Sequence, residues 1–220
     1  MSQLLGLDLG TTGAKTLAID EAGELLATHT EEYPLYHPKQ GWAEQDPDEW
    51  WKAIVDAINQ LLKKEEVERE EIEGLALSGQ MHGSVFLDQD NEVIRPPILW
   101  NDTRTTEQCD EIRRKVGEEE LLEYVGNPAL EGFTAPKLLW LRQNEPENYE
   151  KLAKLLLPKD YIVFKLTGTL VTEVSDAAGT ILFDVKNRKW SEEVCGSLDV
   201  DRDILPRVLD SVDAVGEITS

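Results

Sequence analysis

Short apolar runs separated by turn residues open the chain. Residues 4–9 form one run, residues 14–19 form a second, and Gly10-Thr11-Thr12-Gly13 lies between them. Runs of this length, bounded by glycine and polar residues, are typical of strands joined by tight turns. The pattern therefore predicts a β-hairpin, and a looser alternation over residues 24–33 predicts a third strand beside it.

A helical spacing of apolar residues follows the third strand. Asp46 is suited to cap a helix, Pro47 suits its first turn, and apolar residues then recur on one face at Trp50, Ile54, Ala57, Ile58 and Leu61. Residues 72–78 and 84–88 return to a strand pattern. Three meandering strands followed by a helix and a further, parallel strand predict an α/β fold with a mixed sheet.

The rest of the chain is mainly helical in pattern. The spacing predicts helices over residues 104–115, 118–124, 134–141 and 159–165, and further helices that begin at residues 145–147 and at 191, with a short apolar element over 155–157. A charged turn is predicted over residues 184–190. No internal repeat or low-complexity segment interrupts these elements.

Length and composition fit a globular protein of one large domain or two small ones. The chain has 220 residues, of which 40% are hydrophobic and 30% charged. No apolar run approaches the roughly 18 residues of a membrane span, and the N-terminus has no signal-peptide pattern. The two cysteines, Cys109 and Cys195, match no disulfide or metal framework. We therefore expect a cytoplasmic location.

The formal net charge is −22. This charge argues against nucleic acid or an anionic membrane as a partner. It does not argue against a nucleotide, because a local cluster of backbone N–H groups and a Mg²⁺ ion can offset the field. An ordinary solvated surface and adaptation to high salt both remain explanations of the acidity.

The turn at Gly10-Thr11-Thr12-Gly13 carries the first candidate chemistry. Glycine lets backbone N–H groups approach an anion closely, and the threonine hydroxyls add donors. Asp8 is a carboxylate in an apparently buried strand, which is costly unless it is paired or faces a cation; beside a phosphate it would hold Mg²⁺. The motif is neither a Walker A loop nor a dinucleotide-binding fingerprint. A plain hairpin, with Asp8 capping its turn, remains the alternative.

Met81-His82 lies between Gly79 and Gly83, where the chain can bend sharply. The histidine can hydrogen-bond a hydroxyl group, and the methionine can pack on a carbon face. These groups suit a hydroxylated ligand. A turn with one exposed histidine is the alternative.

Trp100-Asn101-Asp102, followed closely by Arg104, combines an apolar wall with amide, carboxylate and guanidinium groups. Binding a polyol needs that mixture. The alternative is a helix start that Asn101 or Asp102 caps, with Arg104 in a surface ion pair. The three histidines of the chain indicate neither a hydrolytic triad nor a zinc site.

Six segments, taken in chain order, resemble the N-terminal domain of FGGY-type carbohydrate kinases. They are residues 8–13, 78–83, 99–104, 132–137, 157–161 and 175–180. Because they follow one another across nearly the whole chain, the match is far more specific than any one motif. The resemblance implies that residues 1–220 form an actin-like, ribonuclease H-like domain, with a mixed five-stranded sheet and flanking helices. Within the family, Gln80-Met81-His82-Gly83 and residues 126–130 most resemble xylulokinases.

The resemblance also implies an activity, the transfer of a phosphoryl group from ATP to the 5-hydroxyl of D-xylulose with Mg²⁺. Sugar and ATP are then the expected partners, with a possible homodimer in the full-length form. By match of motif the roles divide into four groups: Asp8 to organise Mg²⁺; Gly10, Thr11, Thr12 and Gly13 to face the nucleotide phosphates; Met81 and His82 to touch the sugar; and Trp100, Asn101 and Asp102 to lie near it.

In this family the general base is an aspartate in a glycine-rich segment of a second domain, which also supplies most of the adenosine site. No such segment occurs in the 220 residues. We therefore expect no catalytic base here and no turnover by the chain alone, because phosphoryl transfer needs groups from both sides of the cleft. Two alternatives stay open: half of another FGGY sugar or polyol kinase, and a non-catalytic actin-like binding module.

Overall fold

The computed structural model describes residues 2–219 and divides the chain into two compact units. The N-terminal unit comprises residues 2–35 and 46–80, and the C-terminal unit comprises residues 36–45 and 81–219. Met1 and Ser220, the two ends of the expected domain, lie outside the described residues. Neither unit contains, among the described residues, a helix long and apolar enough to cross a membrane.

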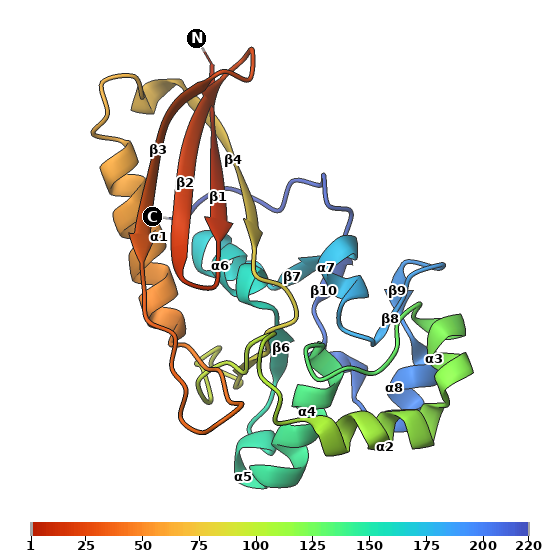
Figure 1. Cartoon of the computed structure of the whole chain (residues 1–220). Coiled ribbons are helices and arrows are strands. Elements are labelled where there is room, and N and C mark those ends of the chain that lie inside the picture. The colour runs from red at the N-terminus through yellow and green to blue at the C-terminus, as the bar shows by residue number, and fades with distance from the viewer. Residues whose placement is uncertain (1, 220) are drawn as a thin grey trace. The chain divides into compact units, whose positions relative to one another are not determined.

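The N-terminal unit is a four-stranded mixed sheet with a helix packed on one face (Figure 1). The strands lie in the order β3-β2-β1-β4, antiparallel except for the parallel pair of β1 and β4. Their bounds are Gln3–Leu9 for β1, Gly13–Asp20 for β2, Leu25–Glu32 for β3 and Ile72–Gly79 for β4. The predicted meander, helix and parallel strand are thus confirmed.

Helix α1 (Pro47–Leu61) begins as the sequence predicts. The side chain of Asp46 accepts a hydrogen bond from the N–H of Asp48 at 2.9 Å, and Pro47 occupies the first turn. The apolar face of α1 packs mainly against β2 and β3. A polar tie adds to this packing, because the Thr16 hydroxyl donates to the carbonyl of Ala57 at 3.3 Å. A 3₁₀ turn, Arg69–Glu71, leads into β4.

Strand β1 alternates between buried and exposed positions. Leu5, Leu7 and Leu9 are buried, whereas Leu4 and Asp8 are exposed. The view of residues 4–9 as a buried strand was therefore wrong for every second residue. A period of two places Asp8 on the open face of the sheet, so its carboxylate does not pay the desolvation cost of a core position.

The C-terminal unit surrounds one large apolar core with helices and three small sheets. The sheets pair β5 with β6, β7 with β10 and β8 with β9. The helices are α2 (Thr106–Val116), α3 (Glu118–Tyr124), α4 (Thr134–Asn144), α5 (Pro146–Tyr149), α6 (Pro158–Thr167), α7 (Val174–Ala178) and α8 (Glu192–Leu198). The strands are β5 (Val85–Leu87), β6 (Lys154–Leu156), β7 (Val171–Glu173), β8 (Phe183–Asp184), β9 (Lys189–Trp190) and β10 (Arg207–Leu209), with a 3₁₀ turn at Arg202–Ile204.

One expectation and one alternative reading fail in this unit. The fifth strand of the chain, β5, pairs antiparallel with β6, and the main sheet of the described residues has four strands instead of the five that the resemblance implies. Helix α2 begins at Thr106 with Thr105 at its N-cap position, so neither Asn101 nor Asp102 caps it. Both errors have a long-range cause that a local pattern does not reveal. The partner of β5 is the distant strand β6, and the side chain of Asp102 bonds to the distant N–H of Ala43.

Helix α4 is buried on all sides over most of its length. Every residue from Thr134 to Leu141 is buried, and that stretch includes the charged side chain of Lys137. A helix enclosed on all sides has no need of an amphipathic pattern. The burial of a lysine there requires that its ammonium group be hydrogen-bonded.

Candidate active site

The turn after β1 is closed by its own backbone. The N–H of Gly10 donates to the carbonyl of Gly13 at 3.0 Å, and the Tyr33 hydroxyl donates to the carbonyl of Gly10. A Cβ atom at Gly13 would lie 2.8 Å from the carbonyl oxygen of Glu31, so the neighbouring strand β3 also requires glycine here. The turn is thus a supported structure, on which Thr11 and Thr12 carry the hydroxyl groups.

Asp8 lies next to this turn on the exposed face of β1. Its carboxylate accepts a hydrogen bond from the Ser78 hydroxyl at 2.9 Å. Lys15 lies opposite Asp8 in the register of β1 and β2. Tyr33 is close enough that the charge of Asp8 adds to the effect of burial, and together they raise the pKa of the tyrosine well above its ordinary value. Tyr33 supports the turn and Ser78 supports the carboxylate, and no local pattern in the sequence indicates either role.

The donor set at this place fits a magnesium–nucleotide complex. Mg²⁺ typically keeps several waters and takes one or two carboxylates together with substrate phosphates. Asp8 supplies one exposed carboxylate. Among residues 2–219 no group of three or more His, Cys, Asp or Glu side chains forms an all-protein metal site. The single exposed carboxylate of Asp8 suits a metal that arrives with phosphate groups.

His82 adopts a left-handed backbone conformation, with φ at 65°. One ring nitrogen, Nδ1, lies 3.0 Å from the carbonyl oxygen of Gly179, and the ring meets the edge of Phe133 with centroids 4.9 Å apart. Burial lowers the pKa of His82, the bond to Gly179 opposes that change, and the positive charge of Lys137 adds to it. His82 is thus a fixed, half-buried residue, and the alternative of an exposed turn histidine is wrong.

Three loops of the C-terminal unit meet around His82. Ser84 pairs with Ile98, which brings the loop after residue 81 beside the loop before Trp100. Gly132 backs so closely onto this second loop that a Cβ atom would lie 2.9 Å from the carbonyl oxygen of Trp100. The structure therefore gathers the predicted sugar-facing segments, residues 81–82 and 100–102, in one part of the unit.

The side chains on these loops differ in exposure. Met81 is 39% exposed and Trp100 is 47% exposed, and Asn101 is exposed as well. Large apolar side chains left open beside polar groups suit contact with a partly apolar ligand such as a sugar. Asp102 is different, because its side chain is buried.

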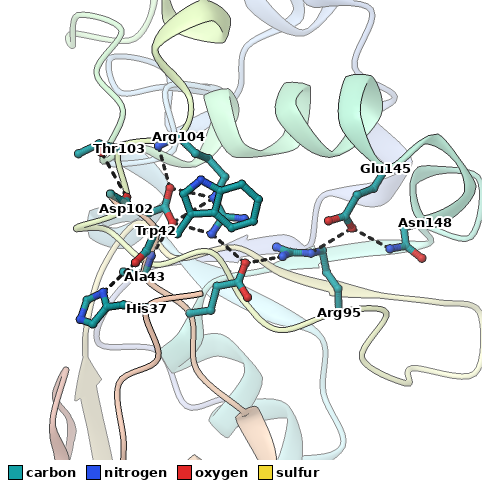
Figure 2. Close-up of polar contacts among 11 residues, drawn as sticks. His37, Trp42, Ala43, Arg95, Asp102, Thr103, Arg104, Glu145 and Asn148 are labelled. Atoms are coloured by element: carbon teal, nitrogen blue, oxygen red, sulfur yellow. Dashed lines mark hydrogen bonds and ion pairs between the residues drawn. The ribbon is translucent and has the colours of Figure 1, made fainter. Parts of the chain in front are cut away.

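The carboxylate of Asp102 is held by internal partners (Figure 2). It accepts from the backbone N–H of Ala43 at 2.7 Å and forms a two-pronged pair with Arg104, whose Nε and Nη2 lie within 3.0 Å of it. Arg104 also meets Glu44 at 2.8 Å, and Glu44 in turn meets Arg95 at 2.5 Å. The alternative of a surface ion pair for Arg104 is therefore wrong, since its side chain is only 1% exposed.

This buried network fixes the loop that bears Trp100 and Asn101. Arg104 is stacked on Trp42, with 3.5 Å between the guanidinium carbon and the ring centroid, and Trp140 lies 4.9 Å away. Charge-assisted, two-pronged bonds of this kind are among the stronger polar contacts in proteins. Through its bonds to Arg104 and Ala43, Asp102 holds the adjoining residues Trp100 and Asn101 in place.

The candidate residues are thus divided between the two units. The N-terminal unit carries Asp8 and Gly10-Thr11-Thr12-Gly13, and the C-terminal unit gathers residues 81–82 and 100–102. A common cleft for both sets stays a prediction. A supported turn beside a carboxylate, together with loops suited to hydroxyl groups, fits a phosphotransferase for a small polar molecule.

The chain belongs to the FGGY family of carbohydrate kinases, whose N-terminal domain matches residues 3–220. It is 44% identical over 218 residues to a xylulose kinase of Bacillus subtilis (strain 168), covering 99% of this chain and 44% of that protein. A solved structure described as a xyloylose kinase from Brucella ovis superposes with a TM-score of 0.94 at 39% identity, over 99% of this chain and 45% of that one.

A second solved structure shows that this fold is shared by kinases of other names. A gluconate kinase from Lactobacillus acidophilus superposes with a TM-score of 0.93 at 28% identity, over all of this chain and 44% of that one. The chain spans between 43% and 45% of the length of the first xylulose kinases it matches.

Proposed function

We propose that this chain is the sugar-binding half of an ATP-dependent xylulose kinase with an actin-like fold. The observation that carries the proposal is the meeting of residues 81–82 and 100–102 in one place, in a chain 44% identical to a protein named xylulose kinase. His82 supplies a fixed hydrogen-bonding ring, Met81 and Trp100 supply apolar faces, and Asn101 supplies an amide. A five-carbon ketose presents the hydroxyl and carbon faces that such groups recognise.

The N-terminal unit would serve the phosphate side of the reaction. Asp8 would hold Mg²⁺, which offsets the negative charge of the transferred phosphoryl group, and Thr11 and Thr12 would donate hydrogen bonds to phosphate oxygens. The exposure of Asp8 and its anchoring by Ser78 support this role. The general base would come from a second domain of the kind the family has, so this half would bind substrate without turning it over.

Binding measurements on the chain test the sugar. Calorimetry with D-xylulose, xylitol, glycerol and gluconate should show heat for D-xylulose above the other three, and His82→Ala should abolish it. A stronger response to gluconate or glycerol would instead favour a different kinase of the family, a candidate that the likeness to the gluconate kinase structure keeps open. A coupled assay with ATP, Mg²⁺ and D-xylulose should show no turnover by these 220 residues.

The nucleotide side needs its own measurement. Addition of MgADP should raise the Tm of the chain, and Asp8→Asn should remove that rise without lowering the Tm of the free protein, because the carboxylate is exposed. Asp20→Asn is the matched control. It lies at the opposite end of the hairpin, where Asp20 accepts from the N–H groups of Ala22 and Glu24, so its nucleotide response should match that of the wild type.

A further inference from the structure

A fully buried lysine contacts the backbone of His82. Lys137, on α4, donates from Nζ to the carbonyl oxygens of His82 at 3.2 Å, Gly132 at 2.5 Å and Phe133 at 2.8 Å. Three acceptors use all three N–H bonds of an ammonium group, whereas a neutral amine has only two to donate. The site is therefore built for the charged form of the lysine.

The three carbonyls come from two segments that meet at His82: the loop of His82 itself and the segment of Gly132 and Phe133. One is the carbonyl of His82 itself, and the Thr134 hydroxyl also donates to it, at 3.2 Å. The other two, from Gly132 and Phe133, belong to the backbone that carries the Phe133 ring against the His82 ring. A single ammonium group thus joins the backbone of the histidine to the backbone of the residue that packs on its ring.

The histidine needs such support. A left-handed backbone conformation is unfavourable for a residue with a side chain, and it persists only where the surroundings hold it. At His82 two donors converge on its carbonyl while Gly179 and Phe133 fix its ring. Strained residues of this kind gather at ligand sites, where they are held ready for the ligand.

We propose that Lys137 is a positioning residue for sugar binding: it holds His82 in its left-handed conformation and so places the imidazole for the substrate. The sugar part of this inference rests on the proposed function. Lys137 itself is enclosed among protein groups, and the charged and titratable groups that act on it are Asp102, Cys109 and Arg104. Burial lowers the pKa of Lys137, and the charge of Asp102 opposes that change. The three carbonyl acceptors also favour the ammonium form over the neutral amine.

Two variants separate positioning from general stability. Lys137→Met removes the charge and all three hydrogen bonds, and we expect at least about tenfold weaker binding of D-xylulose. Thr134→Val keeps the charge and removes one bond to the same carbonyl, so we expect a smaller loss, about threefold. Leu139→Ala, in the core on the same helix, is the matched control: it lowers stability but leaves the affinity of the folded protein unchanged.

The imidazole of His82 provides a readout that needs no sugar. NMR titration of its ring nitrogens should show a higher His82 pKa in Lys137→Met, because a neighbouring positive charge is lost, and no such rise in Thr134→Val or Leu139→Ala. The resonance should also broaden or move in Lys137→Met as the ring loses its fixed position. His82→Ala identifies the signal among the three histidines of the chain.

Each outcome decides something. Wild-type sugar affinity and wild-type His82 titration in folded Lys137→Met would overturn the inference. If that variant does not fold, wild-type affinity for D-xylulose in Thr134→Val, which loses one of the two donors to the His82 carbonyl, would overturn it instead. If the wild-type chain does not bind D-xylulose, the proposed function fails, and the NMR titration alone still decides whether Lys137 positions His82.

Discussion

The guanidinium carbon of Arg104 lies 3.5 Å from the ring centroid of Trp42, and the same group pairs with Asp102 on its edge. Stacking and pairing together remove the arginine from water, since its side chain is 1% exposed. A buried ion pair contributes less than its geometry suggests, but removal of one partner leaves an uncompensated charge in the interior. The arrangement therefore makes a sharp prediction about stability.

Arg104→Met should lower the free energy of unfolding by about 3–5 kcal/mol, because the buried carboxylate of Asp102 would lose its cation. Denaturant unfolding followed by circular dichroism measures the change. Arg202→Met is the control, since Arg202 pairs with Glu192 at 3.0 Å on an exposed surface, and its loss should cost at most about 1 kcal/mol. If both variants lowered the free energy of unfolding by the same amount, burial of the Arg104–Asp102 pair would not be what makes it important for stability.

Local patterns predicted the N-terminal unit well. The apolar runs, the turn residues and the Asp46-Pro47 helix start are short-range signals, and each appears in the structure where it was expected. The number of strands in the main sheet was wrong because β5 finds its partner in β6, far along the chain. No property of the residues in β5 distinguishes those two sheets.

For the same reason, the sequence indicated the segments of the candidate site but not the residues that hold them in place. The segments that bear Asp8, His82 and Trp100 were found because their residue types are unusual for a turn or a strand. Their supports were missed because they are distant in sequence: Lys137 lies 55 residues from His82, and Gly179 lies 97 residues from it. The one available signal was a lysine within the otherwise apolar run of α4, which requires buried hydrogen-bond partners.

The buried carboxylate of Asp176 should make stability depend on pH. Burial raises the pKa of Asp176 from 3.8 to about 6, although the ammonium of Lys159, 3.3 Å away, opposes the shift. Between those values the unfolded chain has released this proton and the folded chain retains it. The stability that the group contributes is therefore lost as pH rises from about 4 to about 6.

Asp176→Asn removes this titration. The free energy of unfolding of the wild type, minus that of the variant, should fall by up to about 3 kcal/mol between pH 4 and pH 7. Denaturant titrations of both proteins at a series of pH values measure it. The charge of Asp160 adds to the rise of the Asp176 pKa, so the difference reports Asp176 together with its coupling to Asp160. Parallel pH curves would contradict the prediction.

The two thiols should be unreactive in the folded protein. Cys109 and Cys195 are buried and free, and burial raises the pKa of each to about 11. Because the thiolate is the reactive form, a thiol reagent such as DTNB should modify neither cysteine at near-neutral pH except through unfolding. Modification should follow the unfolding rate in denaturant, and both thiols should react once the chain is unfolded. Rapid modification without denaturant would contradict this view.

Gly179 should be essential for the placement of His82. A Cβ atom at Gly179 would lie 2.3 Å from Cε1 of the histidine ring, so Gly179→Ala must displace the ring and should weaken D-xylulose binding at least about tenfold. Gly196→Ala, on α8, is the matched control, because nothing lies within 4 Å of its added Cβ; it should bind normally and be slightly more stable. Calorimetry gives both affinities, and NMR of the imidazole shows whether the ring has moved. If the ring moves but the affinity for D-xylulose is unchanged, His82 does not contact the sugar, although the predicted steric clash is correct.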